Sequence, residues 1–90
     1  MVKDKRYSTV KKLIVSDQLN SFPEVFDIIP KSVVAKDLGM NNMRFSRLMN
    51  DVGRFMLKDL HRLADFIEVE GAILVMLADK QFMANKKRKR

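Results

Sequence analysis

A short run between residues 42 and 50 gathers side chains that can recognise the edges of nucleic-acid bases. Asn42 carries an amide that can both donate to and accept from adenine, and Arg47 carries a guanidinium that can donate two hydrogen bonds to guanine. The other polar or long side chains of the run are Met43, Arg44, Ser46 and Asn50. Such groups reach base edges together only if they share one exposed face of a helix.

Two short helices joined by a tight turn are predicted over residues 31–50 and would position that run. The apolar residues of the first helix are Val34, Ala35 and Leu38. Their helical spacing ends at Gly39, because glycine tolerates the positive φ that ends a helix sharply. The apolar stripe of the second helix is Phe45, Leu48 and Met49. Burial of this stripe would leave the polar run on the surface.

The spacing of these residues resembles the helix-turn-helix of the lambda-repressor-like, Cro/CI-type (XRE family) DNA-binding proteins. Ala35 stands where the two helices cross closely, and Gly39 follows four residues later at the turn. Phe45 comes six residues after the glycine, and Leu48 three residues further on. The resemblance covers residues 20–80 and implies a transcriptional regulator, a repressor, that binds double-stranded DNA. The competing interpretation of the pattern is a helical hairpin in an ordinary bundle.

The resemblance also implies roles for individual residues. Base contacts are implied for Asn42, Met43, Ser46 and Arg47. Phosphate contacts are implied for Lys31, Arg44, Asn50 and Arg54. Periodicity leaves open whether Arg44 contacts a phosphate or a base, and Met43 departs from the polar residues usual at its position, which favours contact with a thymine methyl or a looser readout. A bacterial or phage relative would be cytoplasmic and associated with the nucleoid.

Composition agrees with a phosphate-binding surface. The chain has 90 residues, enough for one modest core, and a formal charge of +7. Residues 31–62 hold seven Lys or Arg against three Asp, whereas residues 13–30 and 63–85 are each net acidic. A basic centre between acidic flanks is the electrostatic footprint expected of a DNA-binding face.

The sequence contains few of the residues that other classes of function require. Cysteine is absent and His61 is the single histidine, so we expect no disulfide, no metal and no cofactor. No acid–base pair or phosphate-cradling glycine loop indicates an enzyme. The apolar run 72–78 is far too short to span a membrane. RNA binding is the weaker nucleic-acid alternative, because aromatic stacking platforms are lacking.

The predicted fold is all-α, a compact bundle of about five helices. A disordered basic arm is expected over residues 1–7, the helical domain over 8–84, with the helix-turn-helix at 31–50, and a basic tail over 85–90. Beyond the central pair, helices are predicted to start at Ser8 and at Ser21, and to cover 57–67 and 71–84. Ser21 would cap its helix with Glu24 as capping-box partner, and Met56 leaves the helix at 57–67 weakly capped.

The last predicted helix is apolar on two opposite sides. Val69, Ala72, Ile73, Met76 and Met83 share the side that we expect to pack on the core, and Leu74, Val75, Ala78 and Phe82 share the other. This second side predicts a homodimer on two half-sites about one helical turn (~34 Å) apart, or coverage by the first helix. It also supports an alternative function, a helical protein-interaction module such as the antitoxin-like subunit of a two-protein system, with a protein partner on this side.

Overall fold

Six α-helices and two 3₁₀ turns make up the part of the chain that the computed structural model describes, namely the backbone of residues 4–88 and the side chains of residues 4–86. The elements in order are α1 (Arg6–Val15), η1 (Phe22–Glu24), α2 (Val25–Ile28), α3 (Lys31–Asp37), α4 (Asn42–Asn50), η2 (Val52–Arg54), α5 (Leu57–Ile67) and α6 (Gly71–Arg88). This described part contains no strand, which confirms the all-α prediction.

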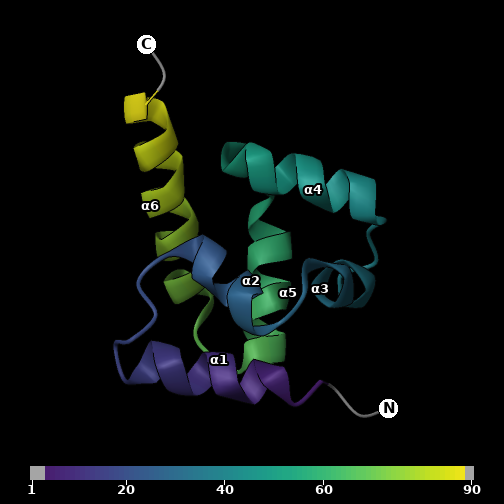
Figure 1. Cartoon of the computed structure of the whole chain (residues 1–90), viewed down its shortest axis with the longest axis vertical. Helices are drawn as coiled ribbons and strands as arrows, with labels where there is room; N and C mark the ends of the chain where they lie inside the picture. Colours follow the sequence, from purple (N-terminus) through teal and green to yellow (C-terminus); the bar gives the residue numbers. More distant parts are fainter. Residues whose placement is uncertain (1–3, 89–90) are drawn as a thin grey trace.

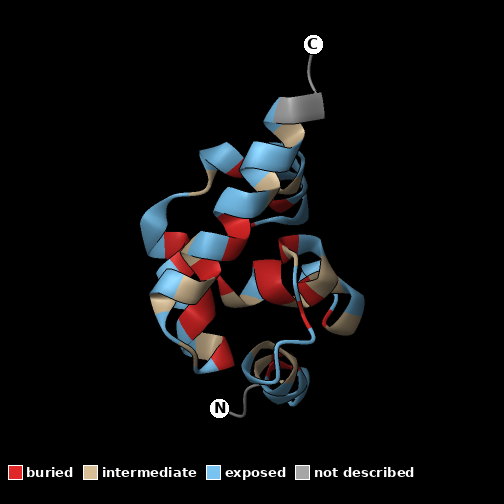
Figure 2. Ribbon diagram, turned by 90° about the vertical axis from the view of Figure 1, so that its left-hand side faces the viewer, coloured by how far each residue is buried: buried red, intermediate tan, exposed pale blue. Residues whose placement is uncertain are grey.

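The helices surround α5. In Figure 1, α4 lies across the top of the molecule, α5 runs down beneath it, and α1 crosses the base. The long helix α6 stands beside α5, and its carboxy-terminal end reaches the top of the molecule. Buried residues gather where the helices face one another, as Figure 2 shows. No helix within residues 4–88 is both long enough and apolar enough to cross a bilayer.

Four phenylalanine rings form a closed set of edge-to-face contacts in and beside the hydrophobic core. Phe22 contacts Phe26 and Phe55, and Phe45 contacts the same two rings, with centroid separations of 5.5 to 5.9 Å. Edge-to-face pairs place the positive ring edge on the negative ring face. The set therefore fixes α4 against η1, α2 and the segment that precedes α5.

The central elements begin and end where the sequence predicts. The helices at Asn42–Asn50 and Leu57–Ile67 have the predicted bounds, and Met56 provides no side-chain cap for α5. The predicted cap at Ser21 differs in detail. Its hydroxyl donates a 2.6 Å hydrogen bond to the Glu24 carboxylate and caps no backbone amide, and the segment starts as a 3₁₀ turn.

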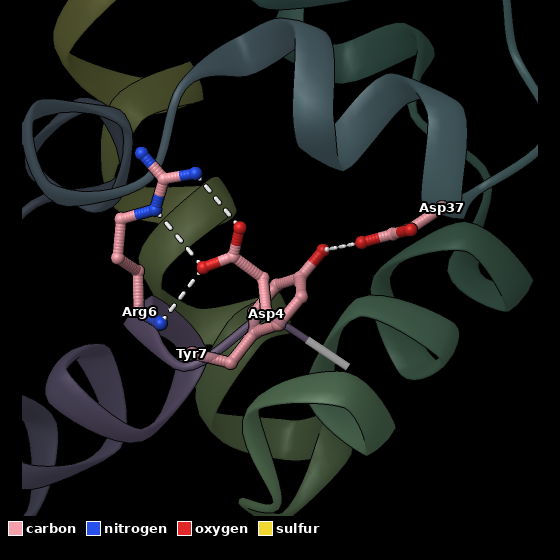
Figure 3. A network of polar contacts seen from close by, with 4 residues as sticks. All are labelled: Asp4, Arg6, Tyr7 and Asp37. Carbon is pink, nitrogen blue, oxygen red and sulfur yellow. Dashed lines mark hydrogen bonds and ion pairs between the residues drawn. The ribbon is translucent and has the colours of Figure 1, made fainter. Parts of the chain in front are cut away.

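The prediction of a disordered arm over residues 1–7 is wrong for its last residues. The first helix starts at Arg6, two residues before the predicted start, and Tyr7 is fully buried. The Tyr7 hydroxyl donates a 2.7 Å hydrogen bond to Asp37 Oδ2 at the end of α3, and its ring stacks on Phe66 with centroids 5.4 Å apart. The contact joins α1 to α3 (Figure 3). Residues 1–3 lie outside the described residues.

The segment before α1 is held by one acid–base pair. The Asp4 carboxylate accepts hydrogen bonds from the Arg6 backbone amide (2.9 Å) and from two nitrogens of its guanidinium (2.9 and 2.7 Å), as Figure 3 shows. The side-chain hydrogen bond from Arg6 is the main cause that lowers the pKa of Asp4 to about 2. Because the Arg6 side chain is exposed and the Asp4 side chain is only partly buried, this pair orients the start of α1 more than it stabilises the fold.

Alkaline pH is expected to destabilise the protein through Tyr7. Burial, and then the hydrogen bond to Asp37, raise the pKa of Tyr7 far above its ordinary value. The folded state therefore keeps the phenol neutral while the unfolded chain ionises above about pH 10, and stability should fall by about 1.4 kcal/mol per pH unit above that point. Urea unfolding at several alkaline pH values, with Tyr7→Phe as the control, measures this loss.

Tyr7 is the single tyrosine of the chain, so tyrosinate absorbance reports on it alone. We expect that absorbance to appear together with unfolding. A phenol that titrates near pH 10 while the protein remains folded, or a Tyr7→Phe variant that loses stability as steeply as the natural chain, would contradict the buried hydrogen bond.

Candidate nucleic-acid interface

The turn between α3 and α4 has the geometry of a helix ended by a left-handed residue. Gly39 has φ +75°, as predicted for this position. Its amide donates to the Lys36 carbonyl (3.0 Å), and the Met40 amide donates to the Ala35 carbonyl (2.8 Å), which together make a Schellman motif. These bonds satisfy carbonyls that the end of α3 would otherwise leave unpaired. The chain therefore leaves α3 in one defined direction.

Asn41 starts α4. Its side-chain Oδ1 accepts a 2.7 Å hydrogen bond from the Arg44 backbone amide, the third residue of the helix. An N-cap of this kind stabilises a helix by about 1 kcal/mol relative to alanine. Asparagine directly before an apolar helical period is a helix-start signal, so this cap can be predicted from local sequence.

Arg62 holds the same turn from α5. Its Nη1 donates a 3.1 Å hydrogen bond to the Leu38 carbonyl, which lies 24 residues earlier in the chain. A cationic donor beside the carboxy-terminal end of α3 also complements the helix dipole. Sequence reasoning missed this residue because no local pattern relates it to Leu38.

Burial divides α4 into two sides. Phe45 and Leu48 are buried in the core, Met49 is half-buried, and these assignments confirm the predicted apolar stripe. The opposite side, which we call the outward face of α4, carries Asn42, Met43, Ser46, Arg47 and Asn50, and every one of them is exposed. Residues one turn apart in this set follow one another along the helix surface. The structure therefore gathers the predicted base-contacting residues on one face.

Met43 is 69% exposed and lies near the middle of that outward face. A large exposed apolar side chain flanked by amide, hydroxyl and guanidinium groups can contact a methyl group while its neighbours form hydrogen bonds. Within residues 4–86, the side chains of Asn42, Ser46, Arg47 and Asn50 form no hydrogen bond or ion pair with the protein. Their polar groups are available to a ligand.

The predicted phosphate-contacting residues come from three elements. Lys31 is the first residue of α3, Arg44 lies on the side of α4, and Arg54 ends η2 directly after α4. All three side chains are exposed. Together with Asn50, these three residues place hydrogen-bond donors for phosphates at both ends of the α3–α4 pair and beside α4.

The predicted dimer interface is wrong for its central residues. Leu74 is fully buried and Ala78 is 5% exposed in the core, while Val75 is half-buried and Phe82 is 41% exposed. This side of α6 packs on α5 and η2. The side expected to face the core instead leaves Met76 65% and Met83 44% exposed. Both sides are apolar, so periodicity could not tell which one α5 covers.

The comparisons with known proteins add no relative. The chain matches none of the protein-family models, and neither the search of curated proteins nor that of solved structures returns a match. Among the described residues, no group of three His, Cys, Asp or Glu side chains could hold a metal ion.

Proposed function

We propose that this chain binds double-stranded DNA in a sequence-specific manner through the outward face of α4 and acts as a transcriptional regulator, a repressor by occupation of a promoter. The observation that carries the proposal is that face itself. It is a helical surface of exposed amide, hydroxyl, guanidinium and apolar groups with no competing partner among the described residues.

The dimensions and chemistry suit the major groove. The groove admits one α-helix, and its base edges present the donors and acceptors that asparagine and arginine pair with. The fixed position of α4 also supports DNA binding. Asn41 caps the helix, buried Phe45 anchors it to the core, and Arg62 forms a hydrogen bond to the turn before it. A helix that is already ordered loses little conformational freedom on binding, which lowers the entropic cost of binding DNA.

Charge supplies the sequence-independent part of the proposed binding. Lys31, Arg44 and Arg54 are exposed and would meet phosphates, which position a protein on the duplex without reading it. A homodimer on two half-sites stays a prediction, and Leu74 and Ala78 cannot form its interface because they are in the core. The same burial takes Leu74 and Ala78 out of the surface predicted to bind a protein partner, and a protein-interaction module stays the alternative function.

The salt dependence of duplex binding tests the electrostatic part of the proposal. Replacing Lys31 by Ala should weaken binding to every duplex similarly and reduce the slope of log Kobs against log salt by about 1. Lys12→Ala is the matched control, because Lys12 is an exposed lysine on α1 at the opposite end of the molecule from α4 (Figure 1). Equal slopes for the Lys31→Ala and Lys12→Ala proteins would remove Lys31 from the interface.

A further inference from the structure

The basic run near the carboxy-terminal end of the chain belongs to α6. The predicted tail over 85–90 is wrong for its first four residues, because the helix continues to Arg88. We call Lys86, Lys87 and Arg88 the basic end of α6, and the side chain of Lys86 is exposed. Residues 89–90 lie outside the described residues. Three consecutive cations are therefore carried on a helix whose direction is fixed by the core.

Phe82 fixes that direction relative to α4. A Cβ placed on Gly53 would lie 2.7 Å from Phe82 Cε1, so the phenyl ring packs directly on the Gly53 backbone. Gly53 is the middle residue of η2, which follows α4 after one residue. The glycine allows this close approach, and α6 is thereby attached to the turn that leaves α4.

Lys86 lies on the same side of α6 as Phe82, because residues four apart occupy the same face of a helix. It is about 6 Å further along the helix axis. The face of α6 that contacts η2 through Phe82 therefore carries the positive charge of Lys86 beyond η2. Figure 1 shows the carboxy-terminal end of α6 above the other helices, at the end of the molecule where α4 lies.

Nearby charges have mixed signs. Arg54 of η2 adds an exposed positive charge, whereas Asp51 and Asp79 are exposed acids near the contact between Phe82 and Gly53. Asp79 precedes Phe82 by three residues and is about 10 Å along the helix from Lys86. Both acids therefore lie near the contact between Phe82 and Gly53, whereas the helix end beyond that contact carries positive charge.

We propose that the basic end of α6 contacts backbone phosphates of duplex DNA beside the segment that α4 reads. The inference rests on the proposed function, since it places a second contact on the same duplex. Lysine acts as a point charge toward phosphate and releases condensed counterions without reading bases. The basic end supplies affinity and lengthens the site covered, and α4 supplies the sequence preference.

Two double variants with the same charge test this contact. Lys86→Gln/Lys87→Gln removes two charges from the basic end, and Lys5→Gln/Lys12→Gln removes two exposed charges at α1, at the base of the molecule (Figure 1). Affinity for a preferred duplex and for a random duplex is measured over a range of salt concentrations. Helix content from circular dichroism verifies that both proteins are folded.

We expect the α6 variant to lose about 2 units of salt slope, at ~0.9 per phosphate, with an unchanged ratio of preferred to random binding. The α1 variant should keep the slope of the natural chain. Equal slopes for the natural chain and the α6 variant, equal losses in the two variants, or a changed binding ratio would each overturn the inference while DNA binding stands. Absence of salt-dependent duplex binding by the natural chain would refute the proposed function as well.

Discussion

Replacing Phe45 by Ala is expected to lower the free energy of unfolding by about 3–5 kcal/mol. The side chain is 1% exposed, and its ring makes edge-to-face contacts with Phe26 and Phe55 at 5.5 and 5.9 Å. The substitution would remove one ring from a closed set of four and leave a cavity in its place. Domains of this size are stable by only about 5–15 kcal/mol, so the variant would be marginal.

Urea unfolding followed by circular dichroism measures this loss. Met43→Ala is the matched control, because Met43 lies on the same helix but is 69% exposed, and its removal should change stability by less than about 0.5 kcal/mol. A loss below about 1 kcal/mol for Phe45→Ala, or equal losses for both variants, would show that α4 is not anchored through Phe45.

Replacing Arg47 by Ala is expected to cost about 1–3 kcal/mol in binding to a preferred duplex and to relax the sequence preference. The exposed guanidinium belongs to the outward face of α4 and pairs with no acid among the described residues. It can therefore donate two hydrogen bonds to one base. Binding to random duplexes should change much less, because that binding depends on phosphates.

Competition between a preferred and a random duplex measures this ratio. Lys12→Ala removes one positive charge far from α4 and should leave the ratio unchanged. If Arg47→Ala weakened preferred and random binding to the same extent, the guanidinium would be a phosphate contact and the proposed readout at that position would be wrong.

Local patterns predicted the centre of the fold well. The buried side of α4 follows from a three-residue apolar stripe, and the positive φ of Gly39 follows from its place directly after Leu38, the last apolar residue before the turn. Both signals lie within a few residues of the structure they determine. The exposure of the eight predicted DNA-contacting residues has the same origin, since most of them fall between buried positions of short amphipathic segments.

Contacts between distant residues explain what the sequence did not reveal. In the sequence, Tyr7 stands among charged residues and is interpreted as part of an arm. Its burial depends on a hydrogen bond from its hydroxyl to Asp37, 30 residues later. Nothing in the local sequence distinguishes Arg62 from other surface cations, because its hydrogen bond to the Leu38 carbonyl forms only in the folded chain. The orientation of α6 depended on which of two apolar sides fits α5, and Leu74 shows the outcome only in the folded chain.

Selection of bound sequences from a pool of random duplex DNA tests base recognition by α4, with the natural chain, Asn42→Ala and Arg47→Ala run in parallel. We expect the natural chain to enrich a defined sequence and both substitutions to degrade positions within it. An inverted repeat with half-sites about one helical turn apart would further indicate two copies on the DNA. Salt-sensitive binding to every duplex with no enriched sequence would contradict base reading by α4.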